Sequence, residues 1–283
     1  MCAQENTIDQ RRYLIGKEIG NGAFGKVHIA DYTDKSSRKK ARLACKIFIE
    51  DSPTNCPSKK FLQRELHILT KIENPNIIHV HSILRHGPRI FIFMSFAEMG
   101  NLSDFIRAKG KVPEQQARIW FRQMASGVQY LHGKNIAHRD LKSDNIVLSK
   151  HFNAKLADFG FARFCVDSDG HPVFSKTYCG SLGYAAPEII RGTPYNPKMA
   201  DVWSLGIILF FMLNVSMPFD VSNLYRLRKA QMSRKLKFRV PTSMAAKSIL
   251  KQILEPDVTL RPTIDRALEN EWVTSSNKIN LAP

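Results

Sequence analysis

The sequence has no hydrophobic run long enough to cross a membrane. Its longest apolar stretch, Leu205–Leu213, is far shorter than the roughly 20 residues that a spanning helix needs. The first segment, Met1–Gly16, mixes acidic and basic residues and lacks the apolar centre of a secretory signal peptide. No Gly follows Met1, which excludes N-myristoylation. We therefore expect a protein that is not bound to a membrane.

Cysteine is also scarce. The 283 residues include five, at Cys2, Cys45, Cys56, Cys165 and Cys179. The number is odd and no two are spaced C-x-x-C, which argues against both a disulfide framework and a zinc site. Reduced thiols indicate a cytoplasmic protein, with the nucleus as the alternative compartment.

Acidic residues are outnumbered by basic ones. Against 25 Asp and Glu stand 42 Lys and Arg, which gives a formal net charge of +17. The densest basic runs are Lys35–Arg42 and Arg226–Arg239. We interpret them as solvated faces; a site for nucleic acid, a membrane surface or a phosphorylated ligand is the alternative.

The chain shows no internal repeat, and its hydrophobic fraction of 43% is typical of a folded globular protein. Residues 13–97 alternate with the period of strands around one helical stretch near Leu62–Leu69. Longer helical patterns follow, so we expect an N-terminal lobe over about 13–97, a C-terminal lobe over about 98–273, and short tails at 1–12 and 274–283. The expected later strands are Ile77–Leu84 and Ile90–Phe96, and the expected long helices are about 114–132, 200–215 and 244–255.

A glycine-rich turn lies early in the first lobe. It reads G-x-G-x-x-G and consists of Gly20, Asn21, Gly22, Ala23, Phe24 and Gly25. The turn is followed by residues that alternate as in a strand and not by a helix, which argues against a dinucleotide-binding site of the Rossmann type. A strand–turn–strand flap can close its backbone N–H groups over anionic oxygens, although such a pattern also fits any flexible loop.

Lys46 and Glu65 are candidates for a charged pair. Lys46 lies on the same strand face as Ala44, because side chains alternate with a period of two. Glu65 flanks the apolar face of its predicted helix, where an unpaired carboxylate costs free energy. The alternatives are a solvent-facing Lys on an edge strand and an exposed Glu at the margin of the apolar stripe.

Five ionisable groups follow in the eight residues His138–Asn145. Asp140 could accept a proton from a hydroxyl group, Lys142 would lie on the same side of an extended chain, and the Asn145 side-chain oxygen suits Mg²⁺. The segments Ile146–Leu148 and Ala154–Ala157 predict a β-hairpin. Its open end would bring Asn145 beside Asp158, so that two oxygen ligands could share a cation with nucleotide phosphates.

Together these residues resemble the signature set of the protein kinases. The match consists of the glycine turn with Val27, then Lys46, Glu65, His138-Arg139-Asp140 with Asn145, Asp158-Phe159-Gly160 and Ala186-Pro187-Glu188. Asp201 and Arg261 are similar to later landmarks of the family, and Arg261 is the expected ion-pair partner of Glu188. The resemblance implies an α+β, bilobal protein-kinase-like fold with a small β-rich N-lobe, a larger and mainly helical C-lobe, and a nucleotide cleft between them.

Lys142 in the Asp140–Asn145 segment resembles the serine/threonine type. Longer strings, such as Ser175–Ser181 and Pro194–Lys198, are similar to the testis-specific serine/threonine kinases. That resemblance implies a role in sperm differentiation and germ-cell expression. Asn101 and Ser143-Asp144 depart from the commoner residues of the family at those positions.

The resemblance also implies roles for individual residues, with ATP and Mg²⁺ as the cofactors. Lys46, held by Glu65, would bind the nucleotide phosphates, and Asn145 and Asp158 would bind the metal. Asp140 would deprotonate the acceptor hydroxyl, and Lys142 would offset the negative charge on the γ-phosphoryl group. Adenine would contact Ile19, Val27, Ala44, Met94, Phe96 and Ala97. Phosphorylation of Thr177 would activate the enzyme through Arg139 and Arg163.

Two rival hypotheses compete with an active kinase that phosphorylates Ser or Thr of protein substrates. A pseudokinase scaffold is disfavoured because Lys46, Glu65, Asp140, Asn145 and Asp158 are all present. A basic nucleic-acid-binding protein is disfavoured because the basic runs lack interleaved aromatic residues. We expect a monomer.

Overall fold

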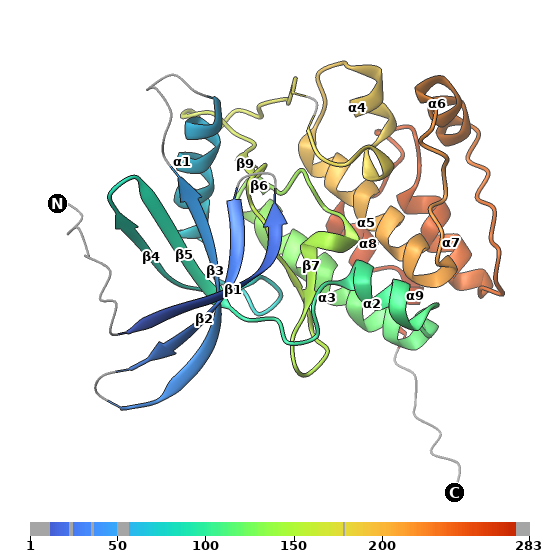
Figure 1. Cartoon of the computed structure of the whole chain (residues 1–283). Coiled ribbons are helices and arrows are strands. Elements are labelled where there is room, and N and C mark those ends of the chain that lie inside the picture. Colours follow the sequence, from blue (N-terminus) through green and yellow to red (C-terminus); the bar gives the residue numbers. More distant parts are fainter. Residues whose placement is uncertain (1–11, 23–24, 35–36, 50–56, 178, 276–283) are drawn as a thin grey trace, which may run out of the picture.

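The computed structural model describes residues 12–22, 25–34, 37–49, 57–177 and 179–275. Over these ranges the chain forms one lobe built on a sheet and one built on helices, which lie side by side in Figure 1. This arrangement confirms the expected two-lobed α+β fold. Ala23 and Phe24 of the predicted glycine turn lie outside the described residues.

The N-terminal lobe is a five-stranded antiparallel sheet in the order β1-β2-β3-β5-β4. Its elements are β1 (Tyr13–Gly22), β2 (Gly25–Thr33), β3 (Lys40–Ile49), α1 (Pro57–Leu69), β4 (Val80–His86) and β5 (Arg89–Ser95). The strand expected from Ile77 begins only at Val80, because Ile77 instead forms a bridge with Leu156 of the other lobe.

Strand β3 lies at the centre of this sheet and is buried on both faces. On one face Leu43 and Cys45 join a cluster with Phe93. On the other face Ala44 and Lys46 line the space between the lobes. The period of two in a strand is therefore what carries Lys46 to the cleft.

The C-terminal lobe packs around α5 (Pro197–Asn214). The Asn196 side chain accepts a hydrogen bond from the Lys198 N–H, and Pro197 occupies the first turn, where its missing N–H costs nothing. Helix α5 is apolar on nearly every side, which is typical of a helix buried at the centre of a lobe. Around it lie α2 (Leu102–Lys109), α3 (Glu114–Gly133), α4 (Pro187–Arg191), α6 (Leu224–Met232), α7 (Met244–Ile253), α8 (Ile264–Leu268) and α9 (Glu271–Thr274).

Apolar periodicity predicts the three long helices to within three residues at each end. Apolar periodicity does not predict the short helices α2, α4, α6, α8 and α9, because each repeats the 3.6-residue period too few times to stand out. The segment from Phe161 to Pro187 has no periodicity, and between Phe161 and Ala186 its described residues form only β9 (Arg163–Phe164), isolated bridges and the single turn η2 (Leu182–Tyr184).

The predicted hairpin is confirmed. Strands β7 (Ile146–Leu148) and β8 (Ala154–Leu156) pair antiparallel. Beyond them the Ala157 N–H donates to the Asn145 carbonyl oxygen at 2.9 Å. This bond brings Asn145 beside the residue that precedes Asp158, as the sequence predicts. A second pairing, of β6 (Ile136–Ala137) with β9, ties the segment before His138 to the segment after Gly160.

Candidate active site

A cleft of about 1240 Å³ lies between the two lobes. At one end it is apolar, and Ala44 faces Met94 there across β3 and β5. Val147 and Ala157 of the β7–β8 hairpin line it from the other lobe, which the sequence does not reveal. An apolar slot of this kind fits a planar base. The predicted base-binding residues all line the cleft: Ile19, Val27, Ala44, Met94, Phe96 and Ala97.

Gly25 is required for a reason that its motif does not suggest. An added Cβ would lie 2.5 Å from the Ile47 carbonyl oxygen, so the close approach of β2 to β3 demands glycine. Gly20 lines the cleft, whereas Gly25 is not among the described residues that do. Asn21 and Gly22 continue β1 alongside β2. Contact with phosphates therefore does not account for Gly25, which the packing of β2 against β3 requires to be glycine.

Lys46 lies between two carboxylates. Its Nζ donates to Glu65 Oε1 at 2.9 Å and to Asp158 Oδ1 at 2.8 Å. Lys46 is 5% exposed and Glu65 3%, so the alternatives of an exposed Lys and an exposed Glu are wrong. The three groups form one buried charge network across α1, β3 and the end of the hairpin.

The pKa values of this network follow from burial and pairing. Burial alone lowers the pKa of Lys46, but the two carboxylates outweigh it, and the net pKa is raised. Burial raises the pKa of Glu65, and Lys46 offsets this only in part. Burial acts upward on the pKa of Asp158, but Lys46, His138 and the Gly160 N–H together outweigh it, and the pKa is lowered. Lys46 is therefore cationic and Asp158 anionic at neutral pH.

Asp140 is held by three neighbours. Lys142 Nζ lies 3.0 Å from Asp140 Oδ2, which confirms that the two side chains share one side of the chain. Asn145 Nδ2 donates to the same oxygen at 3.0 Å, and Ser181 Oγ lies 3.4 Å from Oδ1. Because the Asn145 nitrogen is engaged, the oxygen of its amide is the atom that could accept a cation. Sequence reasoning missed Ser181, whose distance along the chain leaves no local signal.

Asp201 of α5 holds the backbone of the segment before Asp140. Its carboxylate accepts hydrogen bonds from the N–H groups of His138 at 2.9 Å and Arg139 at 2.8 Å. Arg139 has a φ of 69° and Asp158 a φ of 60°, and both values lie in the left-handed region that is costly for residues other than glycine. Buried hydrogen bonds of this kind hold the chain in that conformation. From the sequence, Asp201 was only a landmark.

Three arginines meet beneath the Phe161–Pro187 segment. Burial, and then the positive charges of Arg163 and Arg139, lower the pKa of Arg64. Arg139 Nη2 donates to Cys179 Sγ at 2.9 Å and lies 3.4 Å from the Thr177 carbonyl oxygen. Its Nε is buried and has no hydrogen-bond partner among the described residues.

Of the two predicted arginines, Arg139 reaches the backbone of Thr177, whose side chain is exposed, whereas the structure places Arg163 beside Arg64. Arg64 is a third member that sequence reasoning missed. Its position next to Glu65 on α1 gives no signal, because adjacent residues of a helix do not face the same way.

Comparison with known proteins assigns these features to a family. The family description "Protein kinase domain" matches residues 13–273. The chain belongs to the protein kinases. The kinase is 38% identical to Testis-specific serine/threonine-protein kinase 2 of Mus musculus over 270 residues, which cover 94% of this chain and 74% of the relative. It is 38% identical to Testis-specific serine/threonine-protein kinase 3 of Homo sapiens over 275 residues, which cover 96% of this chain and 100% of the relative.

These relatives confirm that the kinase is of the serine/threonine type. None of its described helices combines the length and the hydropathy that a bilayer crossing requires. Asn101, a departure from the commoner residue that the resemblance implies, caps α2: its side chain accepts from the Asp104 N–H at 2.8 Å.

The kinase also forms the ion pair expected between Glu188 and Arg261. Arg261 Nη1 and Nη2 donate to the two Glu188 carboxylate oxygens at 2.7 and 3.0 Å. Arg261 Nη1 also donates to the Met199 carbonyl oxygen, and its guanidinium lies over the Trp203 ring. Arg261, which lies between α7 and α8, thereby joins α4 to α5.

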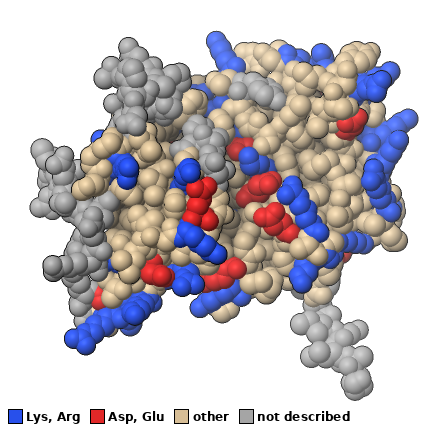
Figure 2. All heavy atoms as spheres, in the orientation of Figure 1, with Lys and Arg blue, Asp and Glu red and all other residues tan. Residues whose placement is uncertain are grey.

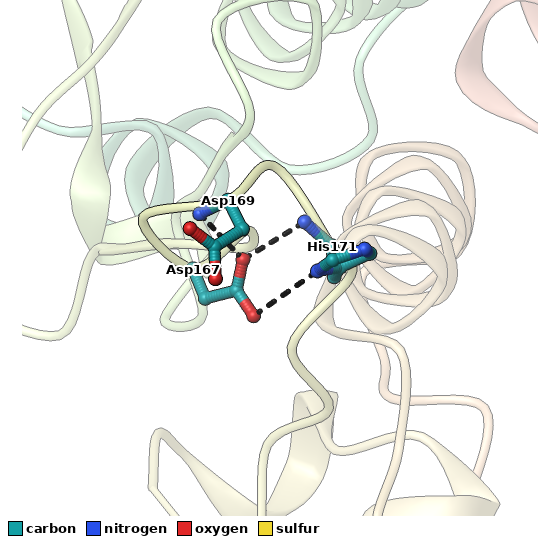
Figure 3. A group of neighbouring side chains, drawn as sticks. All are labelled: Asp167, Asp169 and His171. Atoms are coloured by element: carbon teal, nitrogen blue, oxygen red, sulfur yellow. Dashed lines mark hydrogen bonds and ion pairs between the residues drawn. The ribbon is translucent and has the colours of Figure 1, made fainter.

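One cluster outside the cleft resembles a metal site in composition only. Asp167, Asp169 and His171 come together in an exposed loop of the kinase (Figure 3). Asp167 Oδ1 accepts hydrogen bonds from the N–H groups of Asp169 at 3.0 Å and His171 at 2.9 Å. These bonds are those of an Asx turn, so they account for the cluster as a structural feature of the loop.

Proposed function

We propose that the kinase transfers the γ-phosphoryl group of ATP to Ser or Thr of protein substrates, with residues 13–273 as the catalytic unit. The observation that carries this proposal is the convergence of Asp140, Lys142, Asn145 and Asp158 on a cleft whose other end is apolar. A base would occupy the apolar end, and the charged end would receive the phosphates and the acceptor hydroxyl.

Lys46 would bind the nucleotide phosphates. Its ammonium group already lies between Glu65 and Asp158, at distances that leave it fixed and charged. A fixed cation stabilises negative charge without the cost of reorganising when the nucleotide arrives. Glu65 acts here as a positioning residue because it holds Lys46 from the buried side.

The oxygen donors of Asn145 and Asp158 suit a hard cation such as Mg²⁺. Asp158 has a lowered pKa and is therefore ionised when a cation would bind. The side chain of Asn145 is turned so that its nitrogen faces Asp140, which leaves its oxygen for the metal. Bound Mg²⁺ would supply charge neutralisation at the phosphates.

Asp140 would accept the proton of the substrate hydroxyl as that oxygen attacks the γ-phosphorus. The hydrogen bonds from Asn145 and the ion pair with Lys142 hold the carboxylate in one orientation. Lys142 also donates to Ser181 Oγ at 3.1 Å, so it is placed to offset charge that develops on the transferred group.

Transfer of labelled γ-phosphate to myelin basic protein tests the proposal, with the wild type beside Asp158→Asn and with EDTA as a metal-free control. We expect incorporation by the wild type, which both the substitution and EDTA abolish, because each removes a metal contact. Equal incorporation in both proteins would contradict the assignment of Asp158. No incorporation by the wild type after activation would favour a scaffold without chemistry.

We further infer that phosphorylation of Thr177 activates the kinase. Arg64, Arg139 and Arg163 repel one another, and the Arg139 Nε has no hydrogen-bond partner among the residues described. A phosphate on the exposed Thr177 would supply charge-assisted hydrogen bonds to this pocket and order the loop.

Thr177→Ala is therefore expected to keep the activity of the unphosphorylated enzyme and to lose its response to phosphorylation. The measurement compares peptide kinase rates before and after treatment with ATP or an upstream kinase, with phosphorylation mapped by mass spectrometry. The control is Thr242→Ala, which removes a threonine outside the loop. Ser181 is unsuitable as a control because it contacts Asp140. A Thr177→Ala protein that activates as the wild type does would overturn the inference.

We also propose a role in sperm differentiation, in the cytoplasm of germ cells. The names of the relatives support this proposal, since two relatives that align with most of this chain are called testis-specific. Transcript and protein levels across tissues test it directly. Expression without enrichment in testis would remove the support.

A further inference from the structure

Helix α6 presents an outer face that the catalytic cleft does not use. Its inner side is anchored by buried Leu227 and by Gln231, whose Nε2 donates to the Ala185 carbonyl oxygen at 3.0 Å. On the opposite side Tyr225 and Met232, seven residues apart, point toward solvent and are 75% and 46% exposed. We call this surface the α6 face, and it consists of Leu224, Tyr225, Arg228, Lys229 and Met232.

The α6 face lies in the most basic part of the kinase. From Val221 to Leu254 the sequence contains nine Lys or Arg and no Asp or Glu, in a chain whose net charge is +17. Lys and Arg side chains accordingly gather along the edge of the molecule at α6 and the segment after it (Figure 2). Arg234 forms an ion pair with Glu255. Asp220 also lies near Arg226, and these two acidic residues leave most of the positive charge for another molecule.

An apolar track connects the α6 face to the catalytic cleft. A Cβ added to Gly183 would lie 3.0 Å from Met217 Cε and 3.8 Å from Val221 Cγ1. Met217 lines the cleft together with Ser181, and Val221 is 42% exposed. Only two residues separate Val221 from Leu224, the first residue of α6. A chain whose Ser or Thr occupies the cleft could therefore continue along this track to Tyr225.

We propose that the α6 face docks protein substrates through a segment, separate from the phosphorylated residue, that carries an apolar anchor beside several acidic residues. The proposal rests on the proposed kinase function. Exposed Tyr225 and Leu224 match the apolar anchor, and the surrounding guanidinium and ammonium groups match the acidic residues. A polynucleotide fits less well, because single-stranded nucleic acid needs several aromatic platforms and the α6 face has one.

A binding experiment tests the surface without any need for catalysis. The probe is a fluorescent glutamate–tyrosine copolymer, which contains no Ser or Thr, and its affinity for the full chain is measured by fluorescence anisotropy. We expect Tyr225→Ala and Arg228→Glu each to weaken binding roughly tenfold, a larger loss than most residues of an interface cause when they are truncated. The controls are Leu14→Ala and Arg89→Glu, which change one exposed apolar and one exposed basic residue of the N-terminal lobe and are expected to bind as the wild type does.

A kinetic experiment tests the link to substrates. A short Ser-containing peptide, selected on the wild type from a positional library, is compared with the same peptide joined by a flexible linker to a Leu-Tyr-Glu-Glu-Glu-Glu segment. The extension is expected to lower KM roughly tenfold with kcat unchanged, and Tyr225→Ala to remove that gain while using the short peptide normally.

An unchanged KM on extension, or copolymer binding that Tyr225→Ala and Arg228→Glu leave intact, would overturn the docking site. A polynucleotide that binds with the same dependence on these residues, while the extension has no effect, would also overturn it. Failure to phosphorylate any peptide is a different result: it contradicts the proposed function, and the copolymer measurement still decides whether the α6 face binds acidic segments.

Discussion

An Asp140→Asn enzyme is expected to fold normally and to lose about 10²–10⁴-fold in kcat, the usual contribution of a positioned general base. The Asp140 carboxylate is buried beside Lys142, and Asn145 Nδ2 donates to it at 3.0 Å. An amide of nearly the same shape can keep its place in this network but cannot accept the proton of a substrate hydroxyl. Initial rates at saturating ATP and peptide measure the effect, and the thermal unfolding midpoint reports on the fold.

The matched control is Asp31→Asn, the same chemical change on an exposed carboxylate of β2. Asp31 pairs with Arg42 at 3.2 Å on the surface and takes no part in the cleft. Its kcat should equal that of the wild type. A wild-type kcat for Asp140→Asn would falsify the assignment of Asp140 as the base, because the amide cannot accept the proton of the hydroxyl.

Replacing Arg261 by Met is expected to lower the free energy of unfolding by about 3–5 kcal/mol, because it leaves a buried carboxylate without its partner. Arg261 is 3% exposed and Glu188 6%, and the guanidinium also donates to the backbone oxygens of Met199 and Glu255. Met keeps much of the side-chain volume, so the loss of charge and hydrogen bonds dominates. Urea unfolding monitored by tryptophan fluorescence measures the effect.

Arg266→Met is the control, since Arg266 pairs with Glu269 at 3.7 Å in an exposed position. A surface pair of this kind contributes about 0.2–1 kcal/mol. The double variant Arg261→Met with Glu188→Leu should recover part of the loss, because no lone buried charge remains. Equal destabilisation by Arg261→Met and Arg266→Met would show that the buried pair contributes no more than the exposed one.

The parts of the site that the sequence predicts share one property, which is that local geometry joins them. A two-strand hairpin must bring its open ends together, so Asn145 and Asp158 could be paired from sequence alone. The period of two similarly placed Lys46 with Ala44, and two residues of extended chain placed Lys142 beside Asp140. In each case a short stretch of backbone leaves few alternatives.

The residues that sequence reasoning missed depend on contacts between distant segments. Ser181 reaches Asp140 across 41 positions, and Asp201 reaches His138 across 63. Arg64 meets Arg163 and Arg139 only because α1 packs against β9. Gly25 shows the converse case: its motif identifies the residue, but only the packing against Ile47 shows why glycine is needed there.

By itself the sequence determined the two-lobed fold, the long helices and the order of the chemically active residues, because hydrophobic period and short-range turns act within a few residues. Only the tertiary structure decided which side chains hold Asp140 and Lys46 in place, that Arg139 reaches Thr177, and that α6 turns Tyr225 outward. Those outcomes depend on how separate helices and strands pack, and the free energy of packing is distributed over many contacts that no single stretch of sequence contains.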